Sequence, residues 1–351
     1  MENLDLILPE IFISIAIMFF LLLGVFKKNS SSLIYNLSTI TLVVLLALIY
    51  NLNSTTDTSL FNESYKIDKL STFMKFLLFG SGIFVMLTSS KYIQISKINK
   101  IEYPVLILSS MLGMMVMISS NDLIVFYIGL ELQSLSLYVL ASFNRDNLLS
   151  TESGLKYFVL SALSSGLLLY GCSIVYGFAE STNFNQILYN SSQEQYGLTF
   201  GMVFILVGLA FKISAVPFHM WAPDVYEGAP YPVTAYLAIG SKAAAFALIL
   251  RLVAEGFAPA ADRWEQWQLV LAVFAGLTML AGNLVALAQK NLKRLLAYSS
   301  IGHAGFILAG ITAFSLESDL ASNGVMFYLV GYSITNVVVF AAVISFFNMT
   351  S

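Results

Sequence analysis

Long apolar runs recur along almost the whole chain, and they restrict its fold more than any other feature. Each run has about 20 residues, which is the length of helix that crosses the hydrocarbon core of a bilayer. Of the 351 residues, 58% are hydrophobic and only 11% are charged, which is too little charge for the surface of a water-soluble domain. The sequence therefore predicts an all-α polytopic membrane protein.

The apolar runs divide into eleven predicted spans, at roughly 5–26, 33–51, 70–90, 102–119, 121–143, 155–178, 199–220, 232–254, 268–288, 294–313 and 323–347. Basic residues collect in alternate loops, and the other loops are acidic or neutral. The basic residues are Lys27, Lys28, Lys91, Lys97, Lys100, Arg145, Lys156, Lys290, Lys293 and Arg294. Because positive loops stay on the cytoplasmic or matrix side, we expect the amino terminus outside and the carboxyl end of the sequence inside.

The stretch from Gly208 to Lys242 combines charged residues and helix-breaking prolines within the apolar pattern. Pro217 cannot donate a helical hydrogen bond, so the helix that contains Lys212 should break near it. A broken helix is tolerated at membrane depth only where protein covers it or where it lines a wet cavity. A lysine inside a membrane span costs roughly 2.5 kcal/mol or more, so it usually has a function. This stretch therefore indicates ion handling.

Glu131 lies in the middle of the fifth predicted span, and its own helix offers no partner within one turn. A bare carboxylate is expensive in a low dielectric, so we expect Glu131 to pair with Lys212. A pair that can be made and broken is a proton switch, because loss of the partner favours the uncharged form of each group. The alternative is a static ion pair that holds two helices together.

Three further residues complete the predicted site. Lys242 lies near the middle of the eighth span, where the small neighbour Gly240 leaves room for water or another helix. His303 lies among hydroxyl side chains and can titrate near neutral pH, although a core histidine with satisfied hydrogen bonds is the alternative. Lys156 lies near the end of its predicted span, so a functional role and snorkelling toward the surface are equal alternatives.

Two other residues carry weaker signals. His219 is followed by Trp221 and Pro223, and it could serve in proton transfer or hold the broken loop. Lys75 lies near a span end, where snorkelling is the expected behaviour.

Several kinds of site are missing from the sequence. It has no glycine-rich phosphate loop, no cluster of histidines and cysteines, and no Gly-x-Ser-x-Gly turn. The single cysteine, Cys172, can form neither a disulfide framework nor a cysteine-ligated cluster. We therefore expect no cofactor, no metal and no nucleic acid on this chain, and any redox energy must come from a partner.

Five stretches carry most of the polar residues discussed above. They are IGLELQSLSLYVL, GLKYFVLSALSSGLLLYG, FKISAVPFHMWAPDVYEGAP, VTAYLAIGSKAA and LAQKNLKRLLAYSSIGHAGFILAG. In wording, order and spacing, the chain resembles the N subunit of proton-pumping NADH:quinone oxidoreductase (complex I). This family has members in mitochondria and in the cyanobacterial and plastid enzymes. The resemblance covers most of residues 100–345.

The resemblance implies an antiporter-like fold with two inverted five-helix repeats, each with a broken helix and a buried lysine. It divides the chain into an N-terminal three-helix segment (1–100), a first repeat (101–256) and part of a second repeat (257–351). By motif, Glu131 matches the family's helix-5 glutamate, and Lys212 and Lys242 match its helix-7 and helix-8 lysines. Lys156 matches a basic position on helix 6, and His303 matches a helix-10 histidine. In the family these groups form a polar chain that moves protons.

The resemblance also implies a partnership with the other membrane subunits of complex I, in a bacterial or mitochondrial inner membrane. NADH (or ferredoxin), FMN, iron–sulfur clusters and quinone would be bound by partner subunits. Family members continue past the position of Ser351 with a helix 12 that carries another lysine, so we expect an incomplete second repeat. Two alternatives are a subunit of an Mrp-type sodium/proton antiporter and a structural membrane subunit that pumps nothing.

Overall fold

The structure, a computed structural model, describes residues 4–27, 30–51, 57–190, 195–257, 261–315 and 318–350. Within these ranges, eleven helices are long and apolar enough to cross a membrane. The predicted fold class and the predicted number of spans are therefore confirmed. Lys28, one of the basic loop residues named above, lies outside the described residues.

The helices follow one another through mostly short connections. In chain order the elements are η1 (Leu4–Ile7), α1 (Leu8–Phe26), α2 (Ser31–Asn51), β1 (Thr58–Leu60), β2 (Tyr65–Ile67), α3 (Lys69–Ile95), α4 (Glu102–Ser119), α5 (Leu123–Ala141), α6 (Leu148–Ala179), α7 (Phe184–Asn190), α8 (Gln195–Ile213), α9 (Trp221–Gly228), α10 (Tyr231–Tyr236), η2 (Leu237–Ser241), α11 (Lys242–Arg251), η3 (Leu252–Phe257), α12 (Ala261–Leu287), α13 (Leu292–Thr312) and α14 (Leu320–Thr350).

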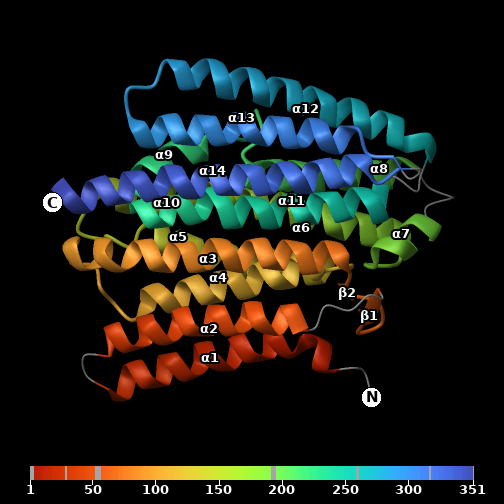
Figure 1. Cartoon of the computed structure of the whole chain (residues 1–351). Coiled ribbons are helices and arrows are strands. Elements are labelled where there is room, and N and C mark those ends of the chain that lie inside the picture. Colours follow the sequence, from red (N-terminus) through yellow and green to blue (C-terminus); the bar gives the residue numbers. More distant parts are fainter. Residues whose placement is uncertain are drawn as a thin grey trace.

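The long helices lie side by side with their axes roughly aligned (Figure 1). Helices α1 and α2 form one edge of the bundle, and α12 and α13 form the other. The antiparallel hairpin of β1 and β2 lies at one end of the bundle with α7, whereas the short helix α9 lies at the opposite end. The two ends of the bundle therefore differ in structure.

The seventh span ends earlier than predicted. Helix α8 stops at Ile213, where Ser214 has a left-handed φ of 62°, instead of continuing toward residue 220. Ala215 N–H donates to Ala210 O at 2.8 Å and Ser214 N–H donates to Phe211 O at 3.0 Å, the paired bonds of a Schellman ending. Trp221 Nε1–H also donates to Phe211 O at 2.8 Å. Protein groups therefore satisfy the broken end, as a membrane interior requires.

The eighth span is interrupted by wider turns and lies at the centre of the bundle. It runs through α10, η2, α11 and η3, and almost all of its residues are buried inside the protein. The π-helical turn η2 ends immediately before Lys242. Single π turns are frequent at functional sites. Lys242, which follows this turn, is buried inside the protein and therefore faces away from lipid.

Helix α5 reaches the centre because it packs closely on α4. A Cβ atom added at Gly113 would lie 2.6 Å from Gly129 O, and one added at Gly129 would lie 2.8 Å from Gly113 O. Only glycine fits at this crossing, and small residues are the usual means of bringing membrane helices into close contact. The crossing fixes the position of the polar residues that follow Gly129 on α5.

Candidate functional site

Lys212 is buried in the last turn of α8, with 7% of its surface exposed. Its Nζ donates to Ser134 Oγ on α5 and to Ser161 Oγ on α6, both at 2.7 Å. Tyr138 Oη–H donates to Ser161 Oγ at 2.6 Å, and its ring centroid lies 6.0 Å from Nζ. The carbonyl-rich carboxyl end of α8 further favours a cation here. We call these four residues the Lys212 cluster.

The predicted Glu131–Lys212 ion pair is not formed by direct contact in this structure. Among the described residues Glu131 makes no ion pair within 4.0 Å, and its Oε1 is buried without a hydrogen-bond partner. Glu131 lies one turn before Ser134 on α5, so its carboxylate still interacts electrostatically with the Lys212 ammonium. The hydroxyls of Ser134 and Ser161 accept the hydrogen bonds of Lys212 Nζ that the sequence predicted for the Glu131 carboxylate.

Helix α5 also connects the Lys212 cluster to the eighth span. Gln133, next to Ser134, donates from Nε2 to Ser241 Oγ at 2.8 Å. Ser241 is the last residue of η2 and immediately precedes Lys242. One side-chain hydrogen bond therefore joins the residue next to Ser134 to the residue next to Lys242.

Lys242 lies with 2% of its surface exposed and contacts α13. Its Nζ donates to Ser300 Oγ at 2.6 Å and to Ser300 O at 3.1 Å. The Ser300 and Tyr332 hydroxyls are 2.8 Å apart, and Tyr332 Oη–H donates to Ala238 O at 3.0 Å. We call Lys242, Ser300 and Tyr332 the Lys242 cluster. Like Lys212, this lysine is held by hydroxyl and carbonyl oxygens.

His303 lies one turn beyond Ser300 on α13 and is half-buried. Its Nδ1 is 2.7 Å from Tyr328 Oη, and its ring centroid lies 5.2 Å from that of Tyr332. The structure therefore places His303 beside the Lys242 cluster.

Lys156 lies apart from these buried groups. Helix α6 begins at Leu148 instead of 155, because Asn147 Oδ1 caps it by accepting from Leu149 N–H at 3.0 Å. Lys156 therefore lies well inside the helix, but its side chain is 42% exposed at the end of the bundle that carries α9. Its Nζ pairs with Glu152 at 2.7 Å and Asp224 at 2.8 Å.

A surface ion cluster forms around Lys156. It consists of Glu152, Lys156, Asp224, Glu227 and Arg294, and Arg294 bridges Asp224 and Glu227 at 2.8 Å each. Burial raises the pKa of Asp224, but the hydrogen bonds and charges of Lys156 and Arg294 outweigh it and hold that pKa below its usual value. The cluster lines a cavity of about 170 Å³ that is open to the surface. The space is large enough for several water molecules.

His219 lies in the turn between α8 and α9, and it is half-buried. Its ring packs edge-on against Tyr298, with centroids 6.5 Å apart, and its carbonyl accepts from Ala222 N–H at 3.0 Å. Burial lowers the pKa of His219, which favours the neutral ring. These contacts fit a residue that holds the loop.

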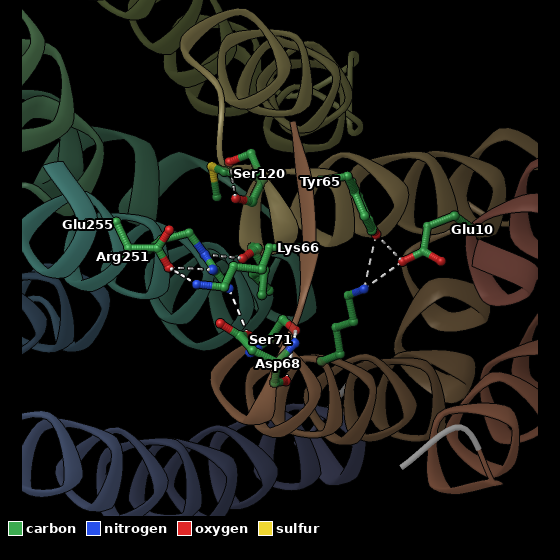
Figure 2. Close-up of polar contacts among 11 residues, drawn as sticks. Glu10, Tyr65, Lys66, Asp68, Ser71, Ser120, Arg251 and Glu255 are labelled. Carbon is green, nitrogen blue, oxygen red and sulfur yellow. Dashed lines mark hydrogen bonds and ion pairs between the residues drawn. The ribbon is translucent and has the colours of Figure 1, made fainter. Parts of the chain in front are cut away.

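A second group of buried charged residues was not predicted from the sequence. Figure 2 shows it at the hairpin end of the bundle, where Glu10 and Tyr65 meet on one side and Lys66, Asp68, Arg251 and Glu255 meet on the other. Lys75 joins the first side through its ion pair with Glu10. We call these seven residues the hairpin ion cluster.

The Glu10 side of the hairpin ion cluster corrects the prediction for Lys75. Glu10 Oε1 accepts from Lys75 Nζ at 2.7 Å and from Tyr65 Oη–H at 2.6 Å, and both charged side chains are only 7% exposed. Lys75 therefore does not snorkel, because Glu10 of α1 lies beside it. The signal in the sequence was a glutamate in the first apolar run.

On the other side of this cluster, the Arg251 guanidinium is completely buried at the end of α11. It donates to Asp68 Oδ1 at 2.9 Å, to Glu255 Oε1 at 3.2 Å and to Ile118 O at 3.2 Å. Lys66 Nζ also reaches Glu255 Oε1 at 2.7 Å. The i,i+4 spacing of Arg251 and Glu255 within an apolar run was the available sequence signal. No group of three or more metal-binding side chains occurs among the described residues.

Apolar spans, a broken helix and lysines buried among hydroxyls define the chain as an antiporter-like membrane subunit. Residues 120–351 match the family model described as "NADH:quinone oxidoreductase/Mrp antiporter, TM". The chain is 59% identical over 346 residues to NADH-quinone oxidoreductase subunit N of Pelagibacter ubique (strain HTCC1062), covering 98% of this chain and 72% of that protein. It is 46% identical to subunit N of Paramagnetospirillum magneticum (strain AMB-1), covering 98% and 71%. The chain belongs to the NADH-quinone oxidoreductase subunit N family.

Two solved structures resemble the chain. A chain of respiratory complex I from Thermus thermophilus matches with a TM-score of 0.79 and 30% identity, covering 95% of this chain and 69% of that one. A chain of the Mrp complex from Dietzia sp. DQ12-45-1b matches with a TM-score of 0.82 and 22% identity, covering 96% and 64%. The second match shows a shared fold alone, because the sequences have diverged so far.

Proposed function

We propose that this chain is a membrane-arm subunit of a proton-pumping NADH (or ferredoxin):quinone oxidoreductase and that its buried lysines carry protons. The observation that supports this is the environment of Lys212 and Lys242. Both lie at membrane depth, and both are bound by hydroxyl and carbonyl oxygens. No carboxylate binds either lysine directly, so each lysine can lose its proton without leaving a directly bound carboxylate unpaired. The loss of one partner from a tight buried ion pair is costly by comparison.

In this proposal Glu131 controls the charge of Lys212. Its carboxylate lies one turn from Ser134, and one oxygen is buried without a partner. A rotation of the Lys212 side chain from Ser134 and Ser161 toward Glu131 would make the pair that the sequence predicts. Making and breaking this contact would shift Lys212 between its charged and neutral forms.

The proton then passes from the Lys212 cluster through Ser134 and Ser241 toward Lys242, and Gln133 holds the Ser241 hydroxyl in place by donating a hydrogen bond to it. From Lys242 it reaches Ser300 and Tyr332, and finally His303. Hydroxyl groups both donate and accept, so they pass protons when water completes the gaps between them. Lys156 belongs to the surface ion cluster, where we assign it a role in proton exchange with the surface.

The same proposal covers organisation and setting. Residues 1–100 form an N-terminal three-helix segment, 101–256 a first repeat (helices 4–8 of the family) and 257–351 part of a second repeat. The amino terminus lies outside, and the basic end with α9 faces the cytoplasm or matrix of a bacterial or mitochondrial inner membrane. Other membrane subunits of complex I are the partners. NADH, FMN, iron–sulfur clusters and quinone are bound by partner subunits.

The test is proton pumping by the whole complex in vesicles. Lys212→Ala and Lys242→Ala should each lower the number of protons moved per quinone reduced while the complex still assembles. Assembly is checked by native gel electrophoresis with a stain for NADH dehydrogenase activity. An unchanged proton ratio in Lys212→Ala would contradict the switch. Transport that depends on sodium and not on NADH would favour an Mrp-type antiporter, and full pumping by both variants would favour a structural subunit.

A further inference from the structure

The break in α8 gives the backbone N–H of Val216 a partner from another helix. In an unbroken helix this N–H would donate to Lys212 O, four residues earlier. In the structure it donates to Thr278 Oγ1 at 2.9 Å. Thr278 lies on α12, so a distant part of the chain replaces the helical bond that would otherwise end at the carbonyl of Lys212.

Thr278 lies on the narrow face that α12 turns toward the rest of the protein. Helix α12 forms an edge of the bundle (Figure 1), and between residues 267 and 287 its buried residues recur at every third or fourth position. They are Trp267, Leu271, Ala275, Thr278 and Gly282. Thr278 carries the only hydroxyl on this face, and none of its surface is exposed. Because burying a hydroxyl is costly unless it forms a hydrogen bond, the bond to Val216 accounts for a threonine at this position.

A second residue of α12 contacts the same loop. Phe274, about one turn before Thr278, packs edge-on against Phe218, with ring centroids 6.2 Å apart and an angle of 89° between the rings. Phe218 follows Val216 by two residues. Helix α12 therefore holds the chain just after the break by a hydrogen bond and by an aromatic contact.

The broken conformation has a cost within α8 itself. Ser214, two residues after Lys212, has the left-handed φ of 62° that residues with a side chain rarely adopt. Such a conformation persists only where the surrounding structure enforces it. The N–H groups of Ser214 and Ala215 bond within α8, whereas that of Val216 bonds to α12. Removal of the acceptor on α12 therefore favours the competing helical bond to Lys212 O.

A change in the break would move Lys212. Helix α9 is fixed in place, because its first residue, Trp221, stacks on Tyr157 with ring centroids 4.6 Å apart. A helical residue advances the chain by about 1.5 Å and an extended one by about 3.3 Å, so winding residues 214–216 into α8 would shorten the connection to α9. The last turn of α8 would then have to shift, and the Lys212 ammonium would leave its hydroxyl partners.

We propose that Thr278 is a positioning residue for Lys212, which keeps α8 broken where the lysine reaches Ser134 and Ser161. This inference rests on the function proposed above. Thr278 lies in the segment 257–351 that we assign to the second repeat, and Lys212 lies in the first. One hydrogen bond from the second repeat thus maintains the site of the buried lysine in the first repeat.

The test compares three substitutions of Thr278 in the assembled complex, reconstituted in vesicles. Thr278→Val keeps the size of the side chain and removes the acceptor, so the number of protons moved per quinone reduced should fall as far as it does in Lys212→Ala. Thr278→Ser keeps the acceptor and should pump normally. Thr278→Cys has a sulfur that accepts hydrogen bonds only weakly, so its loss should lie between the other two.

Thr41→Val is the matched control. Thr41 is also a buried threonine in a membrane span, but its Oγ1–H donates to Leu37 O of its own helix, α2, at 2.9 Å. This variant removes a buried hydroxyl without changing the break in α8, so it should pump normally.

A double variant separates positioning from a general effect on stability. Thr278→Val combined with Lys212→Ala should pump no worse than either single variant, because no lysine is left to position. A residue that acted on the bundle as a whole would add its own loss to that of Lys212→Ala, and this result would overturn the proposal. So would a loss in Thr278→Ser as large as that in Thr278→Val.

Normal pumping by assembled Thr278→Val, with pumping impaired in Lys212→Ala, would overturn the positioning role and leave the proposed function standing. Where valine prevents assembly, Thr278→Cys decides, and normal pumping by that variant would overturn the positioning role. Normal pumping by Lys212→Ala would remove the proposed role of Lys212 and the positioning role with it.

Discussion

The Glu10–Lys75 pair allows a quantitative test of how deeply the N-terminal helices are buried. The perturbations are Lys75→Met and Glu10→Gln, each of which keeps the length of its side chain and removes its charge. Both partners are only 7% exposed, and they are 2.7 Å apart. Removing one partner of such a pair leaves the other charge uncompensated and costs about 3–5 kcal/mol.

The double variant should behave differently from either single variant. With both charges removed, no unpaired charge remains, so most of the loss should be recovered, and the stability should lie within about 1–2 kcal/mol of the unchanged protein. The coupling energy of the double-mutant cycle then isolates the pair from other effects of each substitution.

Amide hydrogen exchange of the assembled complex, read by mass spectrometry, measures this loss where it occurs. Since 1.4 kcal/mol is a factor of ten, a loss of about 3 kcal/mol should speed exchange in α1 and α3 by roughly a hundredfold. Peptides from α6, which does not contact the pair, serve as the internal control. Single variants that exchange less than about fivefold faster would show that the pair is worth no more than a surface ion pair, and the burial argument would fail.

Three further predictions concern other parts of the molecule. Gly129→Ala should destabilise the α4–α5 crossing by roughly 1–3 kcal/mol, because the added Cβ atom would lie 2.8 Å from Gly113 O. Gly166→Ala is the control and should be tolerated, because a Cβ atom there has no neighbouring atom within 4 Å. The melting temperatures of the two variants test this difference. The pKa of Asp224 is lower in the folded protein than its usual 3.8, so the ionised side chain stabilises the fold fully above pH 3.8, and this stabilisation is lost as the pH falls through the folded pKa. In a plot of melting temperature against pH, Asp224→Asn should therefore flatten the decrease on the acid side. Lys242→Arg should assemble but pump poorly, because arginine does not release its proton, and normal pumping by this variant would contradict proton transfer through residue 242.

Features set by local composition were predictable from the sequence. Runs of about 20 apolar residues determine the spans, because a bilayer forces each run to satisfy its backbone as a helix. The burial of Lys212 and Lys242 followed from the apolar residues on both sides of each lysine. The resemblance to complex I named the same lysines, and the identities of 59% and 46% to two subunit N proteins confirm the family.

Features set by contacts between distant helices were not predictable in the same way. Lys75 was expected at the surface because nothing in its own span shows that Glu10 lies across from it. The hydroxyls of Ser134 and Ser161, from two other helices, take the place of Glu131 at Lys212 for the same reason. The end of α8 at Ile213 depends on Ser214 adopting a left-handed φ, a conformation that serine rarely adopts.

The depth of Lys242 has an electrical consequence. The residue lies near the middle of the span from Tyr231 to Gly256, where about half of the voltage across a membrane has been crossed. Moving one elementary charge through the full potential is worth about 2.3 kcal/mol per 100 mV, so placing a proton on Lys242 costs or gains about 1 kcal/mol per 100 mV, depending on the side from which it comes. The hairpin ion cluster, with three positive and three negative side chains, carries no net charge, so it does not change this balance. In the proposed proton path, the voltage across the membrane therefore acts directly on the protonation of Lys242.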